Sequence, residues 1–180
     1  MTELTGPGEA LSRILEYPAA DYHDKIAACR KALEGFRPEA AKQVAEFEEA
    51  VRDLSLEQLQ ELFTRTFDLN PVCSLEVGWQ LYGEEYARGA FLVAMRRRLR
   101  ECGIAEKGEL PDHLIHVLPL LEQMESGEAS LFCAEFLEPA VQKMLASIEG
   151  KGNPYEAVMR SVRMLVEAWR SRSLAEVSHG

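Results

Sequence analysis

The chain has 180 residues, close to the size of one domain, and 47% of them are hydrophobic, an ordinary fraction for a packed globular protein. Its 30 acidic residues against 20 basic ones give a formal net charge of −10, which argues against nonspecific binding to nucleic acid and favours solubility or a basic partner. No apolar run is long enough to cross a bilayer, so we expect no direct membrane insertion.

The N-terminal residues and the cysteines both indicate a cytoplasmic protein. Residues 1–9 are polar and lack the basic region followed by an apolar region that marks a signal peptide. The cysteines are widely separated and form no C-x-x-C pair, so we expect reduced, partly buried thiols. They are Cys29, Cys73, Cys102 and Cys133.

Short amphipathic helices are predicted in the first third of the chain. Pro18 ends the first helix, Asp21 can cap the second, and Pro38 suits the first position of the third. Ser55 and Gln58 form the capping-box pattern of a fourth helix. Apolar residues in these helices recur every three or four positions, and we expect them in the core: Leu11, Ile14, Leu15, Tyr22, Ile26, Cys29, Leu33, Val44, Phe47, Val51, Leu54, Leu59, Leu62, Phe63 and Phe67.

The next segment is less regular and leads into a long helix. Residues 68–78 show no clear period and predict a loop or a short helix. A helix is predicted over residues 84–101, and its middle, residues 89–95, is small or apolar and is expected to be buried. Gly103 ends it. Arginines gather in its last turns, where cations complement the helix dipole: Arg96, Arg97, Arg98 and Arg100.

Three more helices are predicted after this point. One runs over residues 111–126 with Pro119 inside it, and one over 128–148 with Pro139 inside it, so we expect a kink in each. Asn153 can cap the last helix, which is followed by a polar tail. One face of that helix carries Tyr155, Val158, Val162, Leu165, Val166 and Trp169.

About eight helices with short connections, and no alternating strand pattern, predict an all-α fold, an irregular helical bundle in a single domain. Within residues 1–180 we distinguish an N-terminal half (1–103), a hinge (104–110), a C-terminal half (111–172) and a frayed tail (173–180).

Ionisable residues concentrate at the hinge, directly before a strongly apolar helix. Glu109, Asp112, His113 and His116 could hold a metal ion, which would make the protein a metal-dependent hydrolase. The two histidines are three positions apart, whereas zinc-binding helices of the H-E-x-x-H kind place them four apart. The alternative interpretation is structural: Asp112 caps the following helix and His113 bonds to a neighbouring helix.

Other catalytic or binding signals are weak. The arginines within residues 88–100 could bind nucleic acid, but aromatic residues are sparse there and pairing with Glu84, Glu85 and Glu101 fits better. Cys73 is the candidate nucleophile, yet no histidine near it in sequence could activate it. The residues alone therefore indicate an acidic, all-helical domain without a catalytic signature, which could be a binding module.

Four stretches, in this order and spacing, resemble a known family. They are Thr64–Leu69 (T-R-T-F-D-L), Tyr82–Glu84 (Y-G-E), Arg88–Gly89 (R-G) and Glu109–Leu114 (E-L-P-D-H-L). Together they resemble the NarJ-type assembly chaperones, the delta subunit of respiratory nitrate reductase, within the wider TorD-like family of molybdoenzyme chaperones.

This resemblance implies an all-helical protein that has no enzyme activity and no cofactor of its own. Members bind the N-terminal segment of a molybdoenzyme catalytic subunit, that of nitrate reductase or a related oxyanion reductase. They assist insertion of the molybdenum cofactor before membrane docking or export. A monomer, or a dimer formed by exchange of helices about the hinge, is compatible with the pattern. The resemblance places the client-binding or hinge residues at Tyr82, Glu84, Arg88, Glu109, Asp112 and His113.

Overall fold

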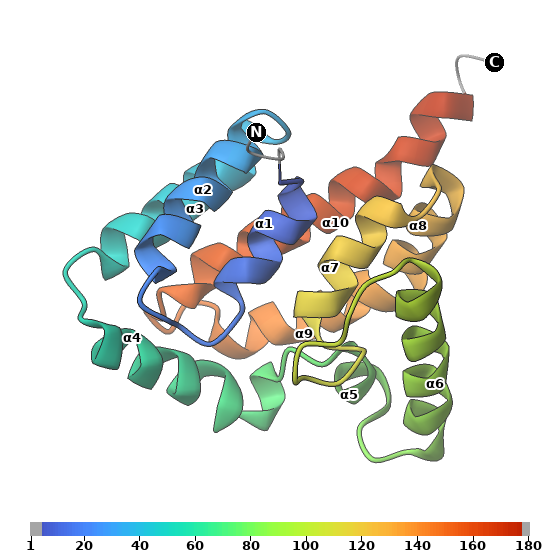
Figure 1. The fold of residues 1–180 in the computed structure, drawn as a ribbon, viewed down its shortest axis with the longest axis horizontal. Coiled ribbons are helices and arrows are strands. Elements are labelled where there is room, and N and C mark those ends of the chain that lie inside the picture. The colour runs from blue at the N-terminus through green and yellow to red at the C-terminus, as the bar shows by residue number, and fades with distance from the viewer. Residues whose placement is uncertain (1–4, 178–180) are drawn as a thin grey trace.

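The computed structural model describes residues 5–177, with the side chains of residues 5–172, and it confirms the all-α fold (Figure 1). The α-helices are α1 (Pro7–Ile14), α2 (Tyr22–Glu34), α3 (Pro38–Val51), α4 (Leu56–Phe63), α5 (Val77–Tyr82), α6 (Tyr86–Glu101), α7 (Leu114–Gln123), α8 (Ser126–Phe132), α9 (Glu138–Ile148) and α10 (Tyr155–Val177). Short irregular turns connect some of them: the π-helical η1 (Thr64–Asp68) and η3 (Cys133–Leu137) and the 3₁₀-helical η2 (Pro71–Cys73).

Helices from both ends of the chain share one hydrophobic core. α1 packs between α2 and α7, and the long α10 packs against α3, α8 and α9 (Figure 1). The backbone N–H of Gly8 in α1 donates to Glu122 Oε1 in α7 at 2.6 Å. A Cβ at Gly8 would lie 2.5 Å from the carbonyl oxygen of Leu118 and 2.7 Å from the Trp169 ring, so only glycine fits between α7 and α10 there.

Buried polar contacts also join the two ends of the chain. The hydroxyl of Tyr22 in α2 donates to the Ile14 carbonyl at 2.7 Å and lies 2.7 Å from the hydroxyl of Tyr155 in α10. Burial raises the pKa of both tyrosines, so both stay protonated at neutral pH.

Most of the predicted helix starts are confirmed, but Asp21, at the N-cap position of α2, makes no side-chain capping hydrogen bond. Ser55 and Gln58 form the predicted capping box of α4. Asn153 Oδ1 accepts the Tyr155 N–H at the start of α10. Pro38 occupies the first turn of α3, where its missing N–H costs nothing.

The region predicted as one kinked helix over residues 128–148 is divided in three. α8 leads through the π-turn η3 into α9, and Pro139 sits in the first turn of α9. A proline has no N–H for the carbonyl four residues earlier, and the wider π-turn just before it accommodates that loss. This division and the short α5 explain why more helices are present than the sequence predicts.

The predicted burial of residues 89–95 is wrong for part of that range. Gly89, Ala90 and Val93 are exposed, and Val93 keeps 68% of its surface in solvent. α6 lies at the edge of the molecule, with only one side packed, against α5 and α7 (Figure 1). Its small and apolar outer residues therefore face solvent in the described part of the chain.

The last helix is longer than the sequence predicts, and the cysteines are unpaired as predicted. Helix α10 continues to Val177, into the range expected to fray, while residues 1–4 and 178–180 lie outside the described part of the chain. The cysteines are free thiols, three of them buried and Cys102 exposed. Within the described residues no helix is both long and apolar enough to cross a bilayer.

Candidate functional site

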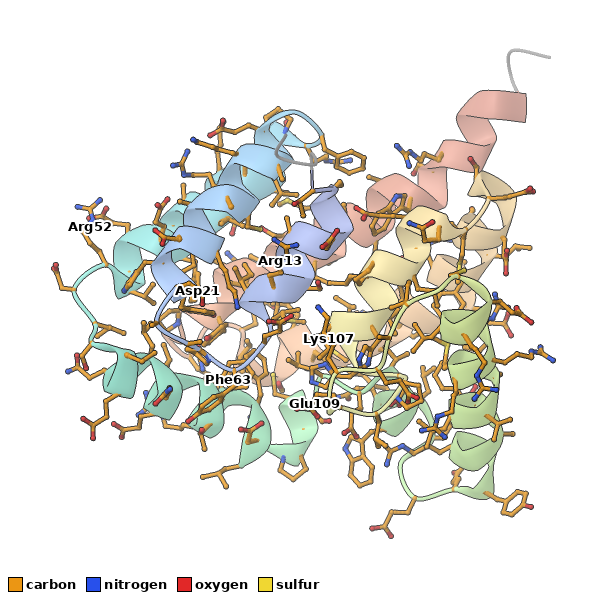
Figure 2. All side chains as sticks on the ribbon, viewed as in Figure 1. Arg13, Asp21, Arg52, Phe63, Lys107 and Glu109 are labelled. Carbon is orange, nitrogen blue, oxygen red and sulfur yellow. The ribbon has the colours of Figure 1, made fainter. Side chains whose placement is uncertain are left out.

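A pocket of about 380 Å³ opens where the end of α4, the start of α5, α6 and the segment before α7 meet. Figure 2 shows Phe63 and Glu109 reaching this region from α4 and from the segment that precedes α7. One wall is apolar, made by Phe63, Phe67, Pro71, Leu75 and Trp79. The polar lining consists of Asp68, Ser74, Glu76, Arg88, Glu109 and His113.

An isolated β-bridge between Glu76 and His113 holds the base of the pocket together. The N–H of Val77 donates to the Asp112 carbonyl at 3.0 Å, and the N–H of Leu114 donates to the Leu75 carbonyl at 2.9 Å. These bonds fix the motif before α7 against the start of α5. They also explain why α7 begins at Leu114 and not at Pro111, since the backbone of residues 112–114 is engaged outside the helix.

Asp112 lies fully buried beneath the pocket. Its Oδ2 accepts the N–H of Gly78 at 2.8 Å and lies 3.9 Å from the Arg88 guanidinium, while its Oδ1 has no hydrogen-bond partner within the described residues. Burial raises the pKa of this carboxyl, and the nearby Glu76 adds to the rise. The Gly78 bond and Arg88 act against it.

The structural alternative, in which Asp112 caps the helix and His113 bonds to a neighbouring helix, is wrong in both assignments. His113 is the N-cap of α7, with its Nδ1 accepting the Ile115 N–H at 3.2 Å. Asp112 instead bonds to the neighbouring helix α5, so the two residues exchange their predicted structural roles. A Cβ at Gly78 would lie 2.7 Å from Asp112 Oδ2, so this close approach requires glycine.

Arg88 is held at the pocket wall by three groups. Its terminal nitrogen lies 2.5 Å from Glu76 Oε2 and 3.9 Å from Asp112 Oδ2, and its guanidinium carbon lies 5.4 Å from the centre of the Trp79 ring. The Nε of Arg88 has no hydrogen-bond partner in the part of the chain that the structure describes. The arginine is therefore held in place mainly by its pairing with Glu76.

The rim of the pocket carries excess negative charge. Burial raises the pKa of Glu109, and repulsion from Asp68 and Glu76 raises it further. Burial also raises the pKa of Asp68. Because only Arg88 opposes these carboxylates in the lining, the pocket favours a cationic group.

Both histidines near the pocket are neutral and hydrogen-bonded. Burial, assisted by His116, lowers the pKa of His113 to about 3. The Nε2 of His116 accepts the Lys107 N–H at 2.8 Å, so its Nδ1 carries the proton and donates to the Leu110 carbonyl at 2.9 Å. His116 thus fixes the backbone at Lys107 and Leu110, on either side of the pocket residue Glu109.

The described side chains do not form the metal site of the alternative hypothesis, a metal-dependent hydrolase built on Glu109, Asp112, His113 and His116. Both nitrogens of His116 are engaged by backbone groups, and the Nδ1 of His113 caps α7. Among the described residues, no group of three or more His, Cys, Asp or Glu side chains is placed to hold a metal ion. Cys73, the candidate nucleophile, is buried with a raised pKa, so its thiol is not activated.

A comparison with models of protein families identifies the family to which this chain belongs. The family model described as nitrate reductase delta subunit matches residues 33–158, which include every residue of the pocket lining. The chain belongs to this family. A search of curated proteins found no match. Members of the nitrate reductase delta subunit family are chaperones of molybdoenzyme maturation, and they work with the nitrate reductase catalytic subunit.

In this member of the delta subunit family, only some of the site residues predicted from the sequence lie at the pocket. Arg88, Glu109 and His113 line the pocket, and Asp112 supports it from below. Tyr82 is half-buried and packs on Phe91, 5.8 Å between ring centres. Glu84 is exposed in the turn before α6. Neither of the last two lines the pocket.

Sequence reasoning missed several pocket residues of the delta subunit family member. Glu76 and Trp79 lie in and just after the aperiodic stretch over residues 68–78, where no pattern indicated which side chains face a cavity. Asp68 was noted only as part of the family motif. One signal was available: a tryptophan that follows an aperiodic segment has no predicted core position and is a candidate for a binding surface.

Proposed function

We propose that this protein is a cytoplasmic chaperone that binds the N-terminal segment of a molybdoenzyme catalytic subunit in the pocket described above. Its client is nitrate reductase or a related oxyanion reductase, and binding assists molybdenum cofactor insertion before membrane docking or export. The observation that carries this proposal is the pairing of an aromatic wall with an acidic rim in one pocket of a family member that functions in molybdoenzyme maturation.

The size and shape of the pocket suit part of a helical peptide. A volume of about 380 Å³ accommodates one or two large side chains but no folded domain. Next to the pocket, Leu69 and Val72 expose 77% and 64% of their surfaces, which extends the apolar area beyond the opening. An amphipathic helix can place one apolar side chain against the aromatic wall and rest its neighbours on these exposed residues.

The electrostatics of the pocket define what must flank that apolar side chain. Asp68 and Glu109 have raised pKa values because they are partly desolvated, and Glu109 is in addition repelled by neighbouring carboxylates. A lysine or arginine from the client, placed between them, would relieve this repulsion and lower both pKa values. Binding is therefore tightest when both carboxyls are ionised, and it weakens as the pH falls towards their raised pKa values.

Calorimetric titration with a peptide from the N-terminus of the client's catalytic subunit tests the proposal, with a scrambled peptide as control. Trp79→Ala removes the largest part of the apolar wall, and we expect it to weaken binding about ten-fold or more. Glu109→Gln keeps the shape of the side chain and removes its charge, so we expect a several-fold loss. Glu57→Gln makes the same chemical change on an exposed carboxylate of α4 outside the pocket and should leave binding unchanged.

The outcomes separate the parts of the proposal. Binding of the full apo-subunit without binding of the peptide would place the client contact outside the N-terminal segment. Tight peptide binding that is insensitive to both pocket variants would place the site elsewhere on this protein. Absence of binding to either client form would refute the chaperone proposal.

A further inference from the structure

The outward face of α6 is unusual for a surface helix. Tyr86 exposes 97% of its surface and Val93 68%, and Gly89 and Ala90 between them are also exposed. Residues 86, 90, 93 and 97 follow one another at helical spacing, so they form one stripe. The opposite face of the same helix, with Phe91, Met95 and Leu99, is buried against the core.

Charges are distributed unevenly along this stripe. Glu84 and Glu85 lie at its N-terminal end, and neither has an ion-pair partner in the described part of the chain. At its C-terminal end, Arg97 makes only a long, exposed contact of 3.9 Å with Glu101, while Arg100 has no ion pair among the described residues. The two ends of the stripe thus carry charges of opposite sign that are largely unpaired among the described residues.

We propose that this outward face of α6 pairs with the same face of a second copy of the chain, in antiparallel orientation. A two-fold axis between Ala90 and Val93 brings these two residues of opposite copies together, and Tyr86 then meets Arg97 of the second copy. The acidic end of each helix lies beside the arginine end of the other. Such a contact is self-complementary, as a symmetric dimer requires.

Several physical terms favour this pairing. Gly89 and Ala90 have small side chains, so the helix axes can approach to the short end of the usual 8–10 Å range. An arginine over the exposed Tyr86 ring adds a cation–π contact. Antiparallel helices also place the positive end of each helix dipole next to the negative end of the other.

The net charge and the small area limit the strength of the dimer. The formal net charge of −10 opposes association, but at physiological salt charges more than about 8 Å apart are largely screened, so the complementary contacts dominate at the interface. The stripe from Tyr86 to Arg100 is about 21 Å long at about 1.5 Å per residue. It buries less than the roughly 800 Å² per partner of a standard stable interface. The dimer is therefore weak and reversible, as transient contacts of small area are.

Sedimentation equilibrium of the full chain, from about 1 to 500 μM, tests the proposal. We expect a concentration-dependent monomer–dimer equilibrium that Val93→Asp weakens at least ten-fold. The control, Leu69→Asp, places the same charge on a residue of similar exposure away from α6 and should leave the equilibrium unchanged. Each variant is checked by circular dichroism, because changes at exposed positions should leave the fold intact.

A charge exchange tests the orientation. A double variant with Glu84→Arg and Glu85→Arg should be monomeric, and so should one with Arg97→Glu and Arg100→Glu, whereas an equimolar mixture of the two should dimerise. A chain that stays monomeric at 500 μM overturns the proposal and leaves α6 free for another protein. A dimer that is unaffected by Val93→Asp and by the charge exchange overturns it in favour of another contact, such as exchange of helices about residues 104–110.

Discussion

Replacing Asp112 by alanine and by asparagine separates the hydrogen bond of this residue from its charge. The carboxylate is fully buried, it accepts the Gly78 N–H at 2.8 Å, and it lies 3.9 Å from the Arg88 guanidinium. Alanine removes both the bond and the charge. Asparagine keeps an oxygen that can accept the Gly78 N–H and removes only the charge.

The magnitudes follow from these contacts. Asp112→Ala leaves the buried Gly78 N–H without an acceptor, which costs about 1–3 kcal/mol in the free energy of unfolding. For a chain of this length, that lowers the thermal midpoint by about 2–4 °C per kcal/mol. Asp112→Asn loses the attraction to Arg88, but the raised pKa of Asp112 shows that its surroundings disfavour the charge. We therefore expect asparagine to stay within about 1 kcal/mol of the natural chain.

Urea unfolding at pH 7, followed by circular dichroism, measures both variants. Asp53→Ala, at an exposed aspartate after α3, controls for loss of a carboxylate at the surface and should change stability by less than about 0.5 kcal/mol. If asparagine destabilises the protein as much as alanine does, then the ion pair with Arg88 and not the Gly78 bond is the stabilising contact. If alanine has no effect, neither contact contributes.

Three further predictions concern the same region. Burial lowers the pKa of His113 from 6.5 to about 3, so this histidine takes up a proton more readily in the unfolded chain than in the folded one. Its share of the unfolding free energy, about 5 kcal/mol, is therefore fully present above pH 6.5 and is lost as the pH falls towards 3. His113→Asn, which keeps a capping side chain, should flatten the fall in unfolding free energy between pH 7 and 4. Gly78→Ala should lower the unfolding free energy, measured by thermal unfolding, by about 3 kcal/mol, because the new Cβ would collide with the Asp112 carboxylate. Gly89→Ala places a Cβ where no atom lies within 4 Å, so it should stabilise α6 by up to about 1 kcal/mol. His116→Phe removes both hydrogen bonds to the preceding segment, so hydrogen exchange of the Lys107 amide should accelerate while the exchange of core amides is unchanged.

The helices were predictable because most of them bury one face in a single core. The apolar periods of α2 and α3 and the caps at Ser55 and Asn153 are local signals, and the structure confirms them. The error at residues 89–95 has a different origin. A small, apolar helix middle is equally compatible with a buried helix and with an exposed contact surface, and only the position of α6 at the edge of the fold decides between them.

The site was less predictable because its contacts join distant parts of the chain. The bond between Gly78 and Asp112 spans 34 residues, and no local pattern indicates it. The family resemblance pointed to Arg88, Glu109, Asp112 and His113, which lie at or beneath one pocket, and also to Tyr82 and Glu84, which lie outside its lining. That these residues bind the client stays a prediction. An aspartate just before an apolar helix can cap that helix or bond to a neighbouring one, and tertiary packing decides between the two.

The contact of Gly8 with α7 and Trp169 has a consequence for the order in which the protein is made. α1 is synthesised before α7 and α10, yet these two helices, together with α2, supply the surfaces that bury its apolar residues. Until α7 and α10 have emerged from the ribosome, Leu11, Ile14 and Leu15, which are fully buried in the finished fold, have only part of their core to pack against. The core around α1 is therefore completed only after α10 has been translated, and until then α1 keeps part of its apolar face exposed, as the client segment does in our proposal before it is bound.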